Sequence, residues 1–154
     1  MEIRPATLDD YDALTALEAE VQAIHVEGAP HIYIPGGVYS RASYAELFAA
    51  PGNVIVLAVE AGQAVGYLHY EVKTREASAF TFGSKTLHVH ALSVKETERR
   101  KGYGEALMAY ALERAAEHQV DRVTLDVGAF NQSAVAFYEK LGFAPSQMRM
   151  AFEL

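Results

Sequence analysis

Three basic residues precede two glycines in the run ERRKGYGEAL of an otherwise acidic chain. Residues 99–101 are Arg, Arg and Lys, Gly102 and Gly104 follow, and the apolar residues beyond them have helical spacing. A helix N-terminus presents unpaired N–H groups and the positive end of the helix dipole, and glycines leave room for an anion to approach. The residue types and their order therefore predict a site for a phosphate or pyrophosphate group.

Two well-known phosphate loops do not match this run. The Walker A pattern, G-x-x-x-x-G-K-[ST], is absent, and a dinucleotide-binding fingerprint would need a third glycine where the chain has Leu107. Taken alone, the run is also compatible with a solvated turn whose glycine packs closely against a neighbour. The choice between these interpretations depends on the rest of the chain.

Two histidines alternate in the run LHVHALSV, which has the composition of a strand. Since side chains alternate along a strand, we expect His88, His90, Leu92 and Val94 to share one face. Imidazole, with an unperturbed pKa of about 6.5, suits a general base at neutral pH. Two other interpretations stay open, namely hydrogen-bonded histidines inside the sheet or an open zinc site completed by His69.

The elements that must position these residues alternate between strands and helices. Thr7 and Asp10 have the spacing of a capping box before an amphipathic helix, and residues 61–62 form a turn between two strands. In chain order we expect strand 2–6, helix 8–24, loop 27–37, helix 43–50, strands 53–60 and 64–72, an undefined segment 73–86, strand 86–94, helix 103–118, strand 121–129, helix 133–141 and strand 147–154. One face of the last strand would carry Met148, Met150, Phe152 and Leu154.

These elements predict an α/β (α+β) fold. A strand–helix–strand unit over residues 86–129 implies a right-handed crossover and a parallel strand pair, whereas the earlier hairpin implies antiparallel pairing. The expected architecture is a mixed sheet with helices on both faces. Because no repeat, low-complexity tract or linker divides the chain, residues 1–154 are expected to form a single domain.

The composition limits the classes of function. Hydrophobic residues make up 51% of the 154 residues, enough for a core, and the formal net charge of −7 argues against nucleic acid or an anionic membrane as a partner. The absence of cysteine excludes disulfides, thiolate metal sites and a cysteine nucleophile. No stretch has the length of a membrane span and the first residues are charged, which predicts a soluble, cytoplasmic protein.

A second run, NQSAVAFYEKLGF (residues 131–143), decides between the interpretations of the basic turn. The chain resembles the GNAT superfamily of acetyl-CoA-dependent N-acetyltransferases over essentially its whole length. Residues 99–104 match that family's [RQ]-x-x-G-x-[GA] pyrophosphate loop, and residues 131–143 match its motif N-x-x-A-x-x-x-Y-x-x-x-G-F without a gap. The run HVHALSV is also similar to the H-x-H-A-L-x-V strand motif of the arylalkylamine N-acetyltransferase branch.

The resemblance implies a GNAT-like, mostly antiparallel central sheet in which the parallel strands 86–94 and 121–129 splay apart. The pantetheine arm of acetyl-CoA would run between them, held by backbone groups as an extra strand would be. The residues expected to bind the cofactor are Leu92, Ser93, Val94, Arg99, Arg100, Lys101, Gly102, Tyr103, Gly104, Glu105 and Asn131. Asn131 has a second interpretation as the N-cap of the helix that follows, and both can hold at once.

The resemblance also implies the roles of the reacting groups. Tyr138 would protonate the departing coenzyme thiolate, and His88 and His90 would remove the amine proton through water. Direct transfer is favoured over an acetyl-enzyme because no cysteine is present, although a serine relay remains an alternative. No metal is expected. Tyr33 and Tyr39, in the run HIYIPGGVY, would line the acceptor site and offer aromatic surface to an amine.

The predicted function is therefore transfer of the acetyl group of acetyl-CoA to a primary amine of a small molecule. The alternatives are an acetyl-CoA sensor without turnover, an acetyltransferase for protein N-termini or lysines, and a histidine-based metal-binding protein. The expected partner is a small-molecule amine, with no nucleic acid and no membrane, and a homodimer is compatible with the sequence.

Overall fold

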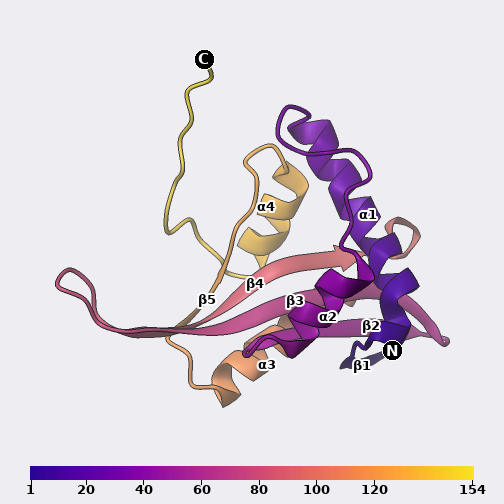
Figure 1. Cartoon of the computed structure of the whole chain (residues 1–154), viewed down its shortest axis with the longest axis horizontal. Helices are drawn as coiled ribbons and strands as arrows, with labels where there is room; N and C mark the ends of the chain where they lie inside the picture. The colour runs from indigo at the N-terminus through magenta and orange to yellow at the C-terminus, as the bar shows by residue number, and fades with distance from the viewer.

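The computed structural model describes residues 1–154 and contains a five-stranded sheet with four α-helices (Figure 1). The strands are β1 (Glu2–Pro5), β2 (Asn53–Glu60), β3 (Gln63–Arg75), β4 (Ser84–Val94) and β5 (Arg122–Leu125). The helices are α1 (Tyr11–Gly28), α2 (Arg41–Ala49), α3 (Tyr103–Glu117) and α4 (Gln132–Lys140), with 3-10 turns at Leu8–Asp10 and Glu96–Glu98. Most predicted elements are found with ends shifted by a few residues, and the undefined segment 73–86 contributes extensions of β3 and β4.

The strands are arranged in the order in which they follow along the chain, β1 to β5. The first four pair antiparallel and β4 pairs parallel with β5, which confirms the mixed, mostly antiparallel sheet. The turn between β2 and β3 uses Ala61 and Gly62, both with positive φ, as a tight hairpin requires. The hairpin therefore fixes the register of the two central strands locally.

Helices cover both faces of the sheet, as predicted. One buried cluster lies on the α1 and α2 side and contains Ala6, Leu14, Leu17, Tyr44, Ile55, Leu57 and Tyr67. The other lies on the α3 side and contains Val56, Ala58, Val65, Leu68, Tyr70, Leu87, Val89, Leu107, Met108, Ala111 and Ala115. Residues of α4 pack against the edge of this second cluster. No helix of the structure combines the length and the apolar character that crossing a membrane requires.

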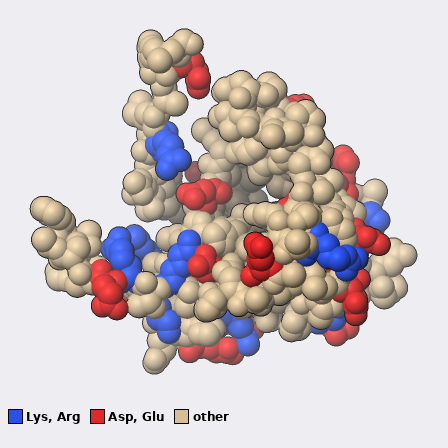
Figure 2. Space-filling model, viewed as in Figure 1, with Lys and Arg blue, Asp and Glu red and all other residues tan.

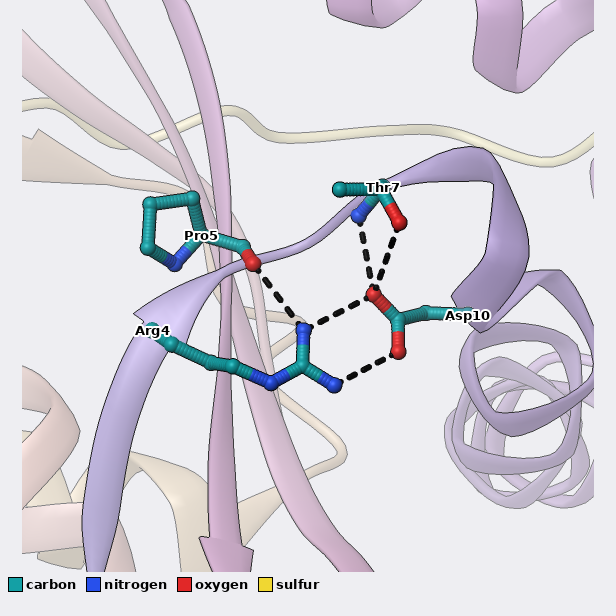
Figure 3. A network of polar contacts seen from close by, with 4 residues as sticks. All are labelled: Arg4, Pro5, Thr7 and Asp10. Carbon is teal, nitrogen blue, oxygen red and sulfur yellow. Dashed lines mark hydrogen bonds and ion pairs between the residues drawn. The ribbon is translucent and has the colours of Figure 1, made fainter.

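The start of the chain is joined to the first helix by the carboxylate of Asp10, which accepts hydrogen bonds from Thr7 and Arg4. Asp10 accepts the Thr7 N–H at 2.9 Å, as the capping-box pattern predicts, and the Arg4 guanidinium at 2.7 and 2.9 Å (Figure 3). The Arg4 hydrogen bond holds the pKa of Asp10 below its usual range against the opposing effect of burial. This network fixes where α1 begins relative to the sheet.

A β-bulge in β4 overturns one sequence prediction. His69 pairs with Ala91 while Tyr70 pairs with Val89, so His90 is an extra residue without a partner on β3. Before the bulge, Leu87 and Val89 face the α3 side, and after it Leu92 and Val94 do. The prediction that His88, His90, Leu92 and Val94 share one face was wrong, because the extra residue reverses the alternation.

The parallel strands separate shortly after they pair. β4 contacts β5 only from Thr86 to Val89, so its last residues have no neighbour on that side. This is the splay that the resemblance implies. The predicted strand 121–129 is shorter than expected because the chain turns there, with Asn131 N–H bonded to the Gly128 carbonyl at 2.9 Å.

The predicted last strand, 147–154, does not form. Residues 144–154 make no backbone–backbone hydrogen bond, and the chain leaves the body of the molecule after α4 (the yellow segment in Figure 1). The four apolar side chains of its predicted buried face are instead exposed, from 78% for Met148 to 116% for Leu154. The prediction was wrong because apolar alternation needs a neighbouring strand to complete it, and none lies beside this segment.

Candidate active site

The basic glycine turn lies at the N-terminus of α3, as the sequence predicts. Gly102 is the N-cap residue with φ of +89°, and a side chain there would meet no atom within 4 Å, so the space above it is open. The first backbone N–H groups of α3 donate no hydrogen bond within the chain; they belong to Tyr103, Gly104 and Glu105. Arg100 has a φ of +62°, a strained conformation for a residue with a side chain and one that is concentrated at ligand sites. The turn therefore offers free donors to an anion.

The basic side chains of the turn differ in their availability. Arg99 donates to the Val94 carbonyl at 3.1 Å and lies 3.7 Å from Glu20. Lys101 donates to Glu98 at 2.8 Å. Arg100 is exposed and makes no hydrogen bond or ion pair, which makes it the cation most available to a phosphate.

The second motif packs directly against this turn. A Cβ placed on Gly104 would lie 3.2 Å from the ring of Phe137, so glycine allows α3 and α4 to approach closely. Asn131 accepts the Ala134 N–H at 3.1 Å, which confirms its interpretation as the N-cap of α4. Glu105 lies 3.3 Å from Lys140, an exposed pair that also joins the two helices.

Tyr138 is half-buried on α4 with a hydroxyl that makes no hydrogen bond within the chain. Its ring packs edge-on against Phe137 and Phe143, with centroids 5.2 and 5.8 Å away. Burial raises the pKa of Tyr138, so the phenol stays protonated at neutral pH. The group can therefore donate a proton or a hydrogen bond to a ligand.

The unpaired end of β4 connects this turn to the histidines. Leu92, Ser93 and Val94 pair with β3 on one side only. Ser93 is buried and its hydroxyl donates to the Leu17 carbonyl at 3.1 Å, so it anchors α1 to the sheet. The free strand edge is available for an extended ligand to bind by backbone hydrogen bonds.

Three histidines gather around the bulge. The ring of His90 lies 4.9 Å from that of His88 and 4.7 Å from that of His69, on β3. Each ring has its own polar partner. His90 Nε2 lies 2.8 Å from the Glu71 carboxylate, His88 Nδ1 lies 2.8 Å from the Thr124 hydroxyl, and His69 Nε2 lies 2.9 Å from Asn53 Oδ1.

The histidine environments differ in their electrostatics. Burial lowers the pKa of His69 to about 4, and the neighbouring His90 adds to the effect. Burial also lowers the pKa of His88. Burial alone would raise the pKa of Glu71, but hydrogen bonds from His90 and Lys73 outweigh it and lower the pKa. His69 is thus neutral at pH 7, while the Glu71 carboxylate is ionised beside His90.

The geometry does not assemble a metal site. The structure contains no group of three or more histidine and carboxylate side chains arranged to hold an ion. The interpretation of His69, His88 and His90 as a three-histidine ligand set therefore has no support in the arrangement of these side chains.

A cavity of about 230 Å³ opens beside His90 on the α1 side of the sheet. Its lining residues are Glu18, Val21, Gln22, His25, Tyr39, Tyr44, Ile55, Tyr67, His69, His90 and Ala91. Figure 2 shows the surface hollowed between α1 and the α4 side, with no broad basic area on this face. The cavity adjoins the bulge at His90, from which point β4 has no partner on its β5 side.

The structure separates the two tyrosines that the sequence places at the acceptor site. Tyr39 lines the cavity. Tyr33 does not, and its ring stacks on His25 with centroids 4.8 Å apart. The ring of Phe130 also packs edge-on against His25, with centroids 6.2 Å apart, which brings the loop after β5 against α1.

Several residues of the site were not predicted from the sequence, notably the lining residues Glu18 and Tyr44 and the His90 partner Glu71. The helical pattern of α1 offers one signal, because Glu18 lies one turn after the fully buried Leu14 and next to the buried Leu17. A polar residue beside buried positions faces either a partner or a cavity. No local pattern marks Tyr44 or Glu71.

Comparison with known proteins shows that this chain is similar to acetyltransferases. The family model described as Acetyltransferase (GNAT) family matches residues 19–143. A mycothiol acetyltransferase of Salinispora tropica is 33% identical over 147 residues, which are 94% of this chain and 45% of that protein. An uncharacterized N-acetyltransferase, YdgE of Bacillus subtilis, is 33% identical over 70 residues, 46% of this chain and 45% of that protein. The chain thus spans about half the length of the curated relatives it matches.

Solved structures share the whole fold. A tetramutant of the BH1408 protein from Bacillus halodurans is 25% identical with a TM-score of 0.96, and the match covers 100% of both chains. The aminoglycoside N-acetyltransferase AAC(6')-Iy in complex with CoA has a TM-score of 0.74 at 14% identity, over 99% of this chain and 98% of that one. The latter likeness shows the fold alone. With the family model matching most of its length, the chain belongs to the Acetyltransferase (GNAT) family.

Proposed function

We propose that this protein transfers the acetyl group of acetyl-CoA directly to a primary amine of a small molecule. The observation that carries the proposal is the course of β4, whose residues 90–94 have no partner on the β5 side and lead from the cavity to the basic turn of α3. One strand edge thus connects a site for an amine to a site for a pyrophosphate. The names of the relatives, a mycothiol acetyltransferase and aminoglycoside acetyltransferases, also favour a small acceptor.

Backbone and side-chain groups along this strand edge have the chemistry to bind the two parts of acetyl-CoA, the pyrophosphate and the pantetheine arm. The free N–H groups of Tyr103 and Gly104 and the unpaired Arg100 would hold the pyrophosphate. The backbone of Leu92 and Val94 would bind the pantetheine arm, and Asn131 would contact the arm from the start of α4. The acetyl thioester would then lie near the bulge, between the cavity and Tyr138.

The acceptor amine must lose a proton before it can attack. An alkylamine has a pKa of about 10.4, so deprotonation at neutral pH costs roughly 4 to 5 kcal/mol. His90 is the base that faces the cavity, and Glu71 accepts a hydrogen bond from its Nε2, which leaves Nδ1 to take the proton directly or through water. The ionised Glu71 then stabilises the imidazolium that forms. His88, held by Thr124, would pass the proton onward to solvent.

The departing thiolate must gain a proton. As the nitrogen–carbon bond forms and the carbon–sulfur bond breaks, the sulfur takes the electron pair. The Tyr138 phenol supplies the proton, since its hydroxyl has no other partner and burial keeps it protonated. The amine proton leaves through His90, so the two transfers balance and no covalent enzyme intermediate is needed.

Thermal unfolding with and without acetyl-CoA tests the cofactor site. Ligand at 100 times its Kd stabilises by about 2.7 kcal/mol, which for a domain of this length raises Tm by roughly 5–10 °C. The variant Arg100→Glu/Gly102→Glu should lose this shift. Arg122→Glu is the matched control, because Arg122 pairs with Thr86 at the opposite end of β4 and should keep the shift. The proposal fails if the folded wild-type protein shows no shift.

Release of thiol from acetyl-CoA over a panel of amines then separates turnover from binding alone. The chain contains no cysteine and adds no thiol background to this assay. Amine-dependent release supports the acetyltransferase. Binding of acetyl-CoA with no release over the whole panel would make the protein a sensor instead.

A further inference from the structure

One carboxylate lines the cavity beside His90, and the reaction proposed above does not use it. Glu18 lies on α1, and its Oε2 accepts the Tyr39 N–H at 2.8 Å and the Tyr44 hydroxyl at 3.2 Å. Its other oxygen, Oε1, makes no hydrogen bond within the chain, and Glu18 forms no ion pair. The side chain is therefore held by one oxygen while the other is available to a ligand.

No positive side chain of the protein neutralises Glu18. The lining contains no Lys or Arg. The ionisable groups that face it are His25 on α1, Tyr39 from the following loop, Tyr44 on α2, Tyr67 and His69 on β3, and His90 on β4. Burial lowers the pKa of His25 and of His69, so both are neutral at pH 7, and burial raises the pKa of Glu18 itself. Glu18 therefore has no cationic partner within the protein, and a cationic ligand could supply one.

The walls around Glu18 suit an organic cation. Tyr39, Tyr44 and Tyr67 surround this part of the cavity, and the faces of tyrosine rings attract ammonium groups. Tyr44 and Tyr67 are almost fully buried, so their positions do not depend on a ligand. Within such a cavity a carboxylate–ammonium contact is only partly screened by water and is correspondingly strong.

We propose that Glu18 binds a second cationic group of the acceptor, so that the cavity selects amines carrying two positive charges, such as α,ω-diamines. This inference rests on the proposed function and names the substrate class of the same site. One amine of the acceptor lies at His90 and becomes acetylated, while the other stays protonated at Glu18. The distance between the two groups sets the preferred chain length.

Calorimetric titration of the protein without acetyl-CoA tests this recognition. The ligands are diaminopropane, diaminobutane and diaminopentane, each paired with a monoamine of the same chain length. We expect at least one diamine to bind at least about tenfold more tightly than its monoamine, because it makes an additional charge-assisted hydrogen bond. Glu18→Gln, which keeps the shape of the side chain, should remove that difference.

Glu27→Gln is the matched control, since Glu27 is exposed on the same helix and lies outside the cavity. It should retain the preference for diamines. Equal binding of diamines and monoamines by the wild type would overturn the inference, and so would a preference that survives Glu18→Gln.

Steady-state assays distinguish failure of this inference from failure of the proposed function. For the preferred diamine, Glu18→Gln should raise KM at least tenfold with little change in kcat. A fall in kcat that is the same for diamines and monoamines would instead make Glu18 a base and overturn its role in recognition. If diamine binding depends on Glu18 but no thiol is ever released, Glu18 still recognises a diamine as a ligand, and it is the proposed function that fails.

Discussion

The sequence predicts a strand both at β3 and at residues 147–154 of the tail (residues 144–154), and only β3 forms. Residues 65–70 of β3 are all buried at the centre of the sheet, while every residue of the tail is exposed. β3 follows β2 through a tight turn, so its pairing partner is its neighbour in the chain. The tail has no such neighbour. Apolar composition thus gives a tendency to form a strand, but pairing decides the outcome.

The largest expected effect is the loss of a side chain from β3. Leu68 is fully buried among residues of the α3-side cluster, so Leu68→Ala removes apolar contacts and leaves a cavity. We expect a loss of about 3 kcal/mol in the free energy of unfolding, measured by urea denaturation. Met150→Ala in the tail is the matched change, with an expected effect below about 0.5 kcal/mol because Met150 is 86% exposed. Comparable losses in the two variants would contradict the structure.

The second prediction uses pH to distinguish buried from exposed histidines. His69 has a folded-state pKa of about 4, below its unfolded value, so the unfolded state binds the proton more readily. The stability contributed by neutral His69 is complete above about pH 6.5 and is lost as the pH falls toward 4. Between pH 7 and 4.5 this single group should cost about 2 kcal/mol.

The measurement is urea unfolding at both pH values for the wild type, His69→Gln and His31→Gln. His69→Gln should lose less stability than the wild type across this interval. His31 lies at the surface, where it forms an exposed pair with Glu153 of the tail at 3.6 Å, and its replacement should leave the pH dependence unchanged. An identical pH dependence in wild type and His69→Gln would contradict the burial of His69.

The third prediction concerns the helix that leads into the tail. Replacing Tyr138 by Phe keeps the ring and its packing but removes the hydroxyl that is proposed to protonate the thiolate. We expect kcat to fall at least about tenfold with little change in acetyl-CoA binding. Tyr110→Phe on α3, where the ring lies under Arg114 at 5.1 Å, removes a hydroxyl elsewhere and should leave kcat unaltered. An unchanged kcat in Tyr138→Phe would remove this residue from the mechanism.

Local signals in the sequence were sufficient for most of the fold. Thr7 with Asp10, the Ala61-Gly62 turn and the glycine turn before α3 each mark an element boundary through residues close together in the chain. The bulge at His90 carries no such signal, because it depends on how β4 lies against β3. The end of β5 at Leu125 reflects a local turn between Gly128 and Asn131, which the strand prediction for residues 121–129 did not include.

The residues of the candidate site also fall into two groups, those that a local motif marks and those that only the fold brings together. Residues that belong to contiguous motifs, such as Gly102 and Tyr138, could be named from the sequence. Glu18 could not, because its environment is built from Tyr39 in a loop and Tyr44 on α2, and only the folded chain brings these together. Tyr33 is the opposite case, a residue named from the sequence that does not line the cavity. Its place in the loop suggested a lining role, but its ring stacks on His25 instead.

The smallest expected effect is that of removing the tail. Deletion of residues 147–154 takes away no backbone hydrogen bond of the fold, and the one ion pair it removes, His31–Glu153, has side chains 59% and 77% exposed. Exposed pairs of this kind contribute little, so we expect the free energy of unfolding to change by less than about 1 kcal/mol. Light scattering on the same samples should give the same oligomeric state with and without the tail. A large loss of stability, or a change in mass, would instead mean that the apolar tail pairs with a sheet edge after all. Because β5 has an unpaired edge in every copy, a change in mass would identify the edge of a second molecule, whereas a loss of stability at constant mass would identify the edge of the same chain.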